Sequence, residues 1–286
     1  MSQRLVVAGC GYVGRATAAL FHTAGWEVIG WTSSAESAAQ LAAEPYAVCA
    51  VDIADAAAVA EAKTAADAVI HCASSGGGGA EEYRRIYLEG ARNLAAAFPR
   101  SLLVFTSSTS VYAQNSGEWV TEESSAEPAR ETGRILRAAE ELILARGGIV
   151  GRLAGIYGPK RSALLRKLLS GEAVIDPGDE RFINQVHRDD IAAALFHLIA
   201  QARSVAEAQI YNVSDNHPIS QRECYQWLAA HLRRPVPPMA TGAPARKRGN
   251  SNKRVSSTKL QALGWAPRYP TFQIAMTESI LPAAGL

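Results

Sequence analysis

Three glycines near the start of this chain have the spacing that holds phosphate groups. Gly9, Gly11 and Gly14 follow the apolar run RLVVA and open an Ala-rich stretch, in the pattern GxGxxG. In a strand–turn–helix unit the first glycine permits a tight turn, the second lets backbone approach a diphosphate, and the third lets the helix pack on the strand. The amides of Tyr12 and Val13 would then face the phosphates. This segment predicts a dinucleotide site.

The end of the second expected strand should hold the ribose of such a dinucleotide. An acidic residue about 20 positions after the glycines usually binds the ribose 2′-hydroxyl, but this chain has Thr32, Ser33 and Ser34 there. Hydroxyl groups do not repel a 2′-phosphate, which favours NADP slightly and leaves NAD open. Asp52 and Ile53 follow the third strand, where Asp52 either meets the adenine edge or caps the helix that begins near residue 55.

The fourth expected strand leads into Ala73 and Ser74, which should border the nicotinamide side of the cofactor. They open the run SSGGGG, residues 74–79, whose four glycines suit a loop that closes over a cofactor. The six histidines and four cysteines show no metal-ligand spacing, so no metal site is predicted. We expect His71 to be a core histidine, and His187 to precede a helix capped by Asp189 or Asp190.

The elements that must position these residues alternate regularly through the first half of the chain. Each β-branched run is too uniformly apolar for a strand with one wet face, and the helices between the runs can cover both faces. We therefore predict an α/β fold with a doubly wound parallel sheet of the Rossmann type. The expected strands are 4–8, 27–31, 47–51, 68–72, 102–107 and 148–154, and the expected helices are 12–24, 35–43, 55–64, 81–98 and 131–146.

After Pro159 the alternation stops, and loops rich in Pro, Gly and basic residues become frequent. We predict that residues 1–155, with returning segments at about 185–214, form the dinucleotide-binding domain. Residues 156–184 and 215–286 should form a smaller C-terminal lobe that binds the substrate. The short linkers favour a cap on the first domain over an independent domain.

Composition narrows the classes of partner. A net charge of +2 favours neither nucleic acid nor a membrane surface as partner. No apolar run approaches the roughly 20 residues of a membrane span, and the N-terminus enters a strand without a signal peptide. Cys10, Cys49 and Cys72 lie in or beside apolar runs, so we expect buried thiols in a reducing compartment. The expected location is the cytoplasm.

Seven further motifs occur in a specific order over nearly the whole chain. They are VDIAD (51–55), AVIHCAS (68–74), LLVFTSSTSVY (102–112), GRLAGIYGP (151–159), FINQVHRDD (182–190), YNVSDNHPIS (211–220) and LGWAPRYPTF (263–272). With them the chain resembles the extended short-chain dehydrogenase/reductase family, in its NAD-dependent epimerase/dehydratase branch. The glycine turn has the spacing GxGxxG instead of that family's usual GxxGxxG. Departures of this kind are typical of divergent members, which are called atypical. The resemblance implies an NAD(P) cofactor, a small-molecule substrate and, as in many members, a homodimer.

The resemblance also implies an active site, which this chain carries only in part. Ser108 matches the family's Ser/Thr after the fifth strand. The family's Tyr and Lys, four residues apart on the next helix, fall on Thr132 and Leu136, and its Asn falls on Tyr87. A threonine hydroxyl is far too weak an acid to be held deprotonated near pH 7, and leucine has no charge with which to tune it. The usual proton relay is therefore absent.

Several side chains could stand in for that relay. The phenol of Tyr87 or of Tyr112 could carry the proton, although a tyrosine at position 87 is more often a core or lid residue. Arg134 or Arg137 could add positive charge from the helix. We expect Glu140 and Glu141 on the solvated side of this helix.

Basic residues of the expected smaller lobe suit a phosphate-bearing substrate. In the family this lobe often holds a nucleotide-linked sugar, and arginine binds a diphosphate with two parallel hydrogen bonds. Arg181 and Arg254, the latter in the basic stretch 245–254, are the candidate anchors. Two functions stay open: an oxidoreductase, epimerase or dehydratase with a rearranged relay, which Ser108 favours, and a cofactor-binding sensor or scaffold without catalysis.

Overall fold

A parallel sheet forms the centre of the protein. The computed structural model describes residues 2–176, 181–202, 208–242 and 251–286. Within them the sheet has the order β11-β7-β5-β4-β1-β2-β3, and every pairing in it is parallel. Its strands are β1 (Arg4–Ala8), β2 (Glu27–Thr32), β3 (Ala47–Ala50), β4 (Ala68–His71), β5 (Leu102–Ser108), β7 (Ile149–Leu153) and β11 (Gln209–Val213). The order reverses between β1 and β4, where a doubly wound sheet binds its ligand, so the predicted fold is confirmed.

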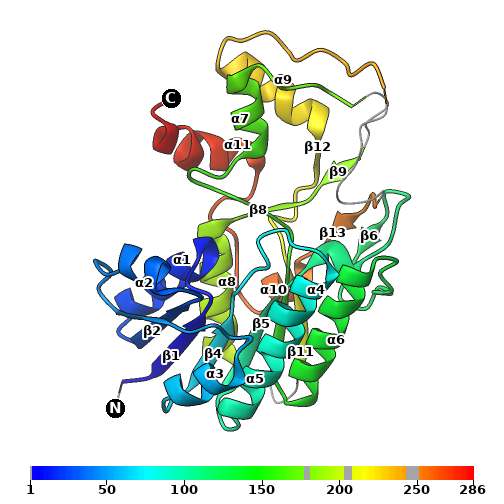
Figure 1. Ribbon diagram of the computed structural model, residues 1–286. Helices are drawn as coiled ribbons and strands as arrows, with labels where there is room; N and C mark the ends of the chain where they lie inside the picture. The colour runs from blue at the N-terminus through cyan, green and yellow to red at the C-terminus, as the bar shows by residue number, and fades with distance from the viewer. Residues whose placement is uncertain (1, 177–180, 203–207, 243–250) are drawn as a thin grey trace.

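Helices cover both faces of the sheet (Figure 1). Side chains that alternate along each strand enter two separate cores, as Val104 and Phe105 of β5 do. The first core packs against α1 (Tyr12–Thr23) and α8 (Arg188–Gln201), and the second against α3 (Ala56–Ala62), α5 (Gly90–Ala97) and α6 (Glu131–Ala145). Burial on both faces is the reason that the strands are apolar throughout.

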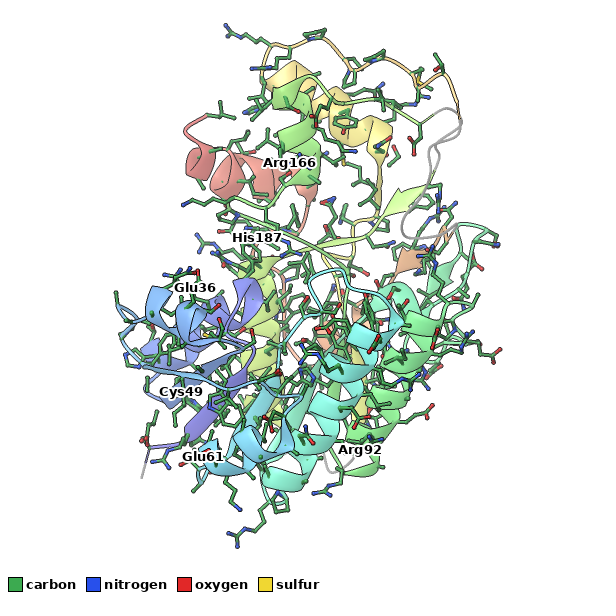
Figure 2. All side chains as sticks on the ribbon, in the orientation of Figure 1. Glu36, Cys49, Glu61, Arg92, Arg166 and His187 are labelled. Carbon is green, nitrogen blue, oxygen red and sulfur yellow. The ribbon has the colours of Figure 1, made fainter. Side chains whose placement is uncertain are left out.

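The outermost strand on one side departs from that pattern. β3 pairs only with β2 in the described chain, and most of its residues are exposed. The short helix α2 (Ala35–Gln40), which precedes it, buries none of its residues. Cys49 of β3 is exposed, so the expectation of a buried thiol there is wrong, whereas Cys10 is buried. Figure 2 shows Cys49 at this edge of the sheet.

Three helices gather above the carboxyl ends of the strands and form a smaller lobe (Figure 1). They are α7 (Ala163–Ser170), α9 (Gln221–His231) and α11 (Phe272–Ala275), the last continued by a π-helical turn over Met276–Ile280 and a 3₁₀ turn over Pro282–Ala284. Apolar side chains of all three meet in a core of their own, with Leu165, Leu228 and Phe272 among its members. Ser220 and Glu223 close a capping box at the start of α9.

Two short strand pairs lie between the two parts: β8 (Gly155–Tyr157) with β10 (Gln185–His187), and β9 (Phe182–Ile183) with β12 (Ile219–Ser220). A third pair, β6 (Trp119–Val120) with β13 (Arg254–Val255), packs on the larger domain, since Val120 and Val255 are buried in its second core. The helix α10 (Thr258–Ala262) corrects the predicted boundary at residue 215. Leu260 and Trp265 are buried in the core that α1 and α8 share with the sheet, so this part of the C-terminal segment belongs to the larger domain. No helix in the described ranges is long and apolar enough to cross a membrane.

Candidate functional site

The glycine turn lies between β1 and α1, at the reversal of strand order. Gly9 has a φ of +102°, and a Cβ on it would lie 2.2 Å from the backbone nitrogen of Ala73. A Cβ on Gly14 would lie 2.1 Å from the carbonyl oxygen of Gly9. Both positions therefore require glycine: one for its backbone conformation and the contact with the β4 loop, the other for the contact between helix and turn.

Gly11 differs from the other two glycines, because a Cβ on it would meet no described atom within 4 Å. It is the N-cap of α1, and the helical hydrogen bonds begin with the amide of Arg15, which donates to the Gly11 carbonyl. Within the described chain, the amides of Tyr12, Val13 and Gly14 are left for an external acceptor. Open space beside unpaired amides at a helix N-terminus fits the diphosphate of a dinucleotide.

The three hydroxyl residues at the end of β2, Thr32, Ser33 and Ser34, differ in exposure. Thr32 is buried and donates to the carbonyl of Ser34 at 3.3 Å, whereas Ser33 is exposed. Ser34 caps α2, since its side chain accepts the amide of Ser37 at 3.2 Å. Of the predicted ribose contacts, Ser33 thus keeps a hydroxyl without a partner in the described chain.

Asp52 does not cap the next helix. The cap of α3 is Asp55, whose carboxylate accepts the amides of Ala57 and Ala58 at 2.9 and 3.2 Å. Asp52 instead accepts the amide of Ala54 and forms a 2.8 Å ion pair with Arg85. Of the two predicted roles of Asp52, the structure excludes the cap and leaves the adenine edge. Ile53, beside it, is buried in the core.

The end of β4 contacts Tyr87 through the loop that follows it. The expected helix 81–98 is broken into α4 (Ala80–Tyr83), a π-helical segment (Arg84–Glu89) that carries Tyr87, and α5. The phenol oxygen of Tyr87 accepts the amide of Ser75 at 3.4 Å, and its ring stacks on His71. Ser74 accepts the amide of Gly76 at 3.3 Å. π-Helical segments are frequent at functional sites.

Ser108 and Thr132 lie on neighbouring elements at the same edge. Ser108 ends β5 and caps a 3₁₀ turn over Thr109–Val111, accepting the amide of Ser110 at 3.1 Å. Thr132 is the second residue of α6, a helix that contacts this turn. An ion pair of 3.5 Å between Glu131 and Arg84 ties the start of α6 to the π-helical segment. The three candidate catalytic residues therefore come from elements that meet at the carboxyl edge of the sheet.

The cationic stand-ins for the missing lysine are engaged elsewhere. Leu136 is a core residue, 3% exposed. Arg134 donates to the carbonyl of Ala129 at 2.8 Å, and Arg137 pairs with Glu140 and Glu141. Neither arginine makes a hydrogen bond to Thr132 in the described chain, so the relay of a phenol beside an ammonium group is absent from α6.

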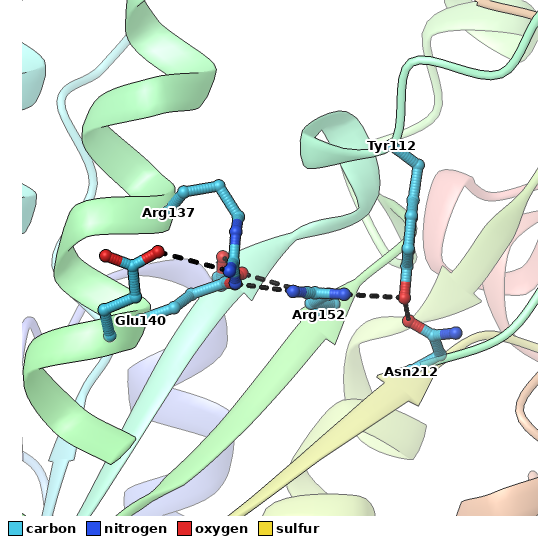
Figure 3. Close-up of polar contacts among 7 residues, drawn as sticks. Tyr112, Arg137, Glu140, Arg152 and Asn212 are labelled. Atoms are coloured by element: carbon cyan, nitrogen blue, oxygen red, sulfur yellow. Dashed lines mark hydrogen bonds and ion pairs between the residues drawn. The ribbon is translucent and has the colours of Figure 1, made fainter. Parts of the chain in front are cut away.

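Glu140 overturns the expectation that it is solvated, because its side chain is wholly buried. One carboxylate oxygen accepts from Ser107 at 2.6 Å and from Nε of Arg152 at 3.1 Å. The other accepts from Nη2 of Arg152 at 2.7 Å and from Arg137 (Figure 3). An arginine within the apolar strand β7 was the signal in the sequence, since a buried cation needs a partner.

Tyr112 belongs to the same network and is not available as a proton carrier. Its side chain is 1% exposed. The hydroxyl accepts a hydrogen bond from Nη1 of Arg152 at 2.8 Å and donates one to Oδ1 of Asn212 at 2.9 Å. Burial raises the pKa of Tyr112 above its usual value. The network joins α6, β7 and β11 beneath the site (Figure 3).

The two predicted substrate anchors come together although they are far apart in the sequence. Arg181 donates to the carbonyl of Ser251 at 2.5 Å, and the guanidinium of Arg254 lies 4.2 Å from the ring centroid of Phe182. Between them, the amine of Lys253 is buried and donates to the carbonyl of Tyr112 at 2.9 Å. Burial, with the charge of Arg181 nearby, lowers the pKa of Lys253 to about 8. Other residues of the basic stretch, 245–250, lie outside the described residues.

The two histidines singled out by the sequence have structural roles. His71 is buried, contacts the carbonyl of Ile86 at 3.1 Å, and has its pKa lowered by burial to about 4, so it is neutral at pH 7. His187 itself caps α8 by accepting the amide of Asp189, which corrects the prediction that Asp189 or Asp190 is the cap. Its Nε2 lies 3.0 Å from Ser279 in the smaller lobe, and Figure 2 shows it where the two parts meet.

Comparison with known proteins assigns the family. The sequence profile of the NAD dependent epimerase/dehydratase family matches residues 5–214, and the chain belongs to that family. A candidate NAD-dependent epimerase/dehydratase of Methylobacillus flagellatus has a similar structure, with 27% sequence identity, 100% of both chains covered and a TM-score of 0.80. No curated protein matches the chain.

More distant structures share the fold. The UDP-Glc/GlcNAc 4-epimerase of Campylobacter jejuni is 17% identical, with 100% of both chains covered and a TM-score of 0.81. MoeE5, solved with UDP-glucuronic acid and NAD, is 20% identical, with 99% of both chains covered and a TM-score of 0.79. The seven-stranded parallel sheet with a lobe over its carboxyl edge is therefore common to proteins that differ in most of their residues.

Proposed function

We propose that the chain binds a pyridine dinucleotide at the glycine turn and acts as an epimerase/dehydratase-like oxidoreductase on a small, phosphate-bearing molecule. The observation that supports this most is the open space at Gly11 beside the amides of Tyr12, Val13 and Gly14. The bound cofactor would supply hydride transfer. The chain would supply the diphosphate cradle, the ribose contact at Ser33 and the border formed by Ala73 and Ser74.

The hydroxyl groups at the end of β2 slightly favour NADP in this proposal. Neither a carboxylate nor an arginine occurs between Thr32 and Ala35. A carboxylate there would repel a 2′-phosphate, and its absence removes that penalty without adding a cation that selects for the phosphate. Comparison of the four nucleotides in one assay decides between the two cofactors.

The substrate side of the proposal depends on Arg181 and Arg254. Their guanidinium groups come from segments that the structure brings together around Phe182, where arginine could hold a diphosphate. A nucleotide sugar is the substrate class with that chemistry, and relatives of the same fold are named for UDP-sugars.

The proton relay proposed here uses hydroxyl groups without an ammonium. Tyr87 accepts an amide hydrogen from Ser75, so its own phenolic proton remains to be donated. Ser108 and Thr132 complete the set at the ends of β5 and the start of α6. Substitution of Tyr87 by Phe should abolish turnover while cofactor affinity is retained, which separates this role from a purely structural one.

A second function is favoured by the buried Leu136 and the absent phenol–ammonium pair. In this alternative the chain is a non-catalytic NAD(P)-binding sensor or scaffold. It predicts that oxidised and reduced cofactors bind with different affinities and alter a partner interaction. The oxidoreductase predicts instead a change in nicotinamide absorbance when the protein, cofactor and a panel of nucleotide sugars are mixed.

Thermal unfolding with NAD⁺, NADH, NADP⁺ and NADPH tests the shared step. A ligand at 100 times its Kd should stabilise the protein by about 2.7 kcal/mol. G11A should keep the melting temperature of the free protein but lose the shift with ligand, because its methyl group fills the diphosphate space. G242A is the control, since Gly242 is also exposed with no atom within 4 Å of an added Cβ. If none of the four nucleotides shifts the melting temperature of the unsubstituted protein, the proposal fails.

A further inference from the structure

The side chain that follows the glycine turn is held between two arginines from other segments. Tyr12, the first residue of α1, donates its hydroxyl to the carbonyl of Pro159 at 2.9 Å. The guanidinium carbon of Arg161 lies 5.1 Å from the centroid of its ring, and that of Arg188 lies 5.0 Å from it. Two cations are therefore one side chain away from the N-terminus of α1.

The backbone around these arginines is closely fixed. Gly158 and Arg161 exchange two backbone hydrogen bonds, at 3.1 and 2.9 Å. Gly158 has a φ of +151°, and a Cβ on it would lie 2.6 Å from the hydroxyl of Tyr12. Arg188 is the first residue of α8, directly after the cap His187. Both guanidinium groups are thus carried by positioned backbone, one at the entrance to the smaller lobe and one at a helix start.

Negative charge around this pair is insufficient to neutralise it. Nε of Arg188 donates to Asp189 at 2.8 Å, which leaves its two terminal nitrogens for another acceptor. Arg161 has no carboxylate within ion-pair distance among residues 2–176, 181–202, 208–242 and 251–286. The Tyr12 ring offsets part of the repulsion between the two cations through cation–π contact. The helix N-terminus adds further positive potential.

We infer that Arg161 and Arg188 form a guanidinium pair that strengthens binding of the cofactor's diphosphate at the first turn of α1. This inference rests on the proposed function, because it assigns two further residues to the same site. Neither residue belongs to the glycine motif. Since Arg161 precedes α7, the same contact joins cofactor binding to the segment that enters the smaller lobe.

The test is titration of R161A and R188A with NADPH and NADH, followed by nicotinamide fluorescence. Each variant should bind about threefold to tenfold more weakly than the unsubstituted protein, the upper value corresponding to about 1.4 kcal/mol. The loss should shrink as salt is raised, because the contact is electrostatic. R166A is the matched control: Arg166 lies on α7, its side chain is 69% exposed, and its removal changes the net charge equally.

ADP-ribose, measured by competition, identifies the part of the cofactor that the pair contacts. It keeps the diphosphate and lacks nicotinamide and the 2′-phosphate, so both variants should weaken its binding by the same factor as that of NADH. If R161A and R188A bind NADPH as tightly as R166A does, or if ADP-ribose binding is unaffected, the inference is overturned while the proposed cofactor site stands. Failure of the unsubstituted protein to bind any pyridine nucleotide would instead contradict the proposed function. Circular dichroism spectra identical to that of the unsubstituted protein establish that the variants are folded.

Discussion

Replacement of Glu140 by glutamine should destabilise the protein strongly, although the two side chains have the same shape. Both carboxylate oxygens accept hydrogen bonds, from Ser107 and Arg152 on one side and from Arg152 and Arg137 on the other. Whichever way a glutamine is turned, its NH₂ group faces a donor. Arg152, 1% exposed, would also lose the negative charge that compensates it and would keep only neutral acceptors, namely the remaining amide oxygen of residue 140 and the hydroxyl of Tyr112.

Removal of one partner of a buried ion pair costs about 3–5 kcal/mol. At about 2–4 °C per kcal/mol for a chain of this order of size, the melting temperature should fall by on the order of 10 °C. Urea unfolding followed by circular dichroism measures the free energy directly. E141Q is the control, because the Glu141 side chain is 67% exposed and its loss should change stability by less than about 0.5 kcal/mol.

The double substitution E140M/R152M separates an ion-pair effect from loss of packing. Because it removes both charges and keeps apolar volume, it should be more stable than E140Q. A cost of E140Q below about 1 kcal/mol would show that the buried carboxylate is not needed by Arg152. A double variant less stable than E140Q would show that packing of the charged side chains, and not their pairing, stabilises this region.

Three further predictions concern other parts of the fold. D55A removes the acceptor of two amides at the start of α3 and should lower the unfolding free energy by about 1 kcal/mol in urea, whereas an unchanged value would show that the cap is unimportant. The pKa of Lys253 falls from 10.5 to about 8 on folding, so the unfolded chain binds more protons than the folded protein between those two pH values. The free energy of unfolding should therefore rise with pH across that interval, by at most about 3 kcal/mol. Urea titrations at a series of pH values measure this rise, and K253M should abolish it. G158A places a Cβ 2.6 Å from the Tyr12 hydroxyl at a φ of +151°, so it should lower the free energy of unfolding by about 1–3 kcal/mol. A melting temperature equal to that of the unsubstituted protein would contradict the close contact.

Much of the larger domain is predictable because its signals are local. Uniformly apolar runs separated by helical segments identify a parallel sheet, and each strand expected up to residue 154 occurs within a few residues of its predicted bounds. The expected helices do so too, except that the helix predicted over 81–98 has a π-helical middle segment. The glycine spacing likewise identifies the turn, since Gly9 and Gly14 are required by backbone contacts within or next to it. The NAD-dependent epimerase/dehydratase resemblance, made from short motifs, is confirmed by the family profile.

Several of the errors concern residues whose surroundings come from elements that are distant in the sequence. Exposure of Cys49 depends on β3 being the last strand of the sheet in the described chain, which no local pattern specifies. His187 caps α8 through Nδ1 while its Nε2 lies 3.0 Å from Ser279 of the smaller lobe, although the neighbouring aspartates have the higher local preference for a cap.

The sequence by itself determined the strands of the sheet up to residue 154, most of the helices between them and the place of the glycine turn, because periodicity and backbone freedom act over a few neighbouring residues. Only the tertiary structure decided which side chains meet. Glu140 looks solvated on its helix until Arg152 of β7 is placed against it, and Arg181 and Arg254 converge only when β9 and β13 are brought to the same edge. The physical reason is that burial of a charge depends on the partner that folding supplies, and that partner lies in another element.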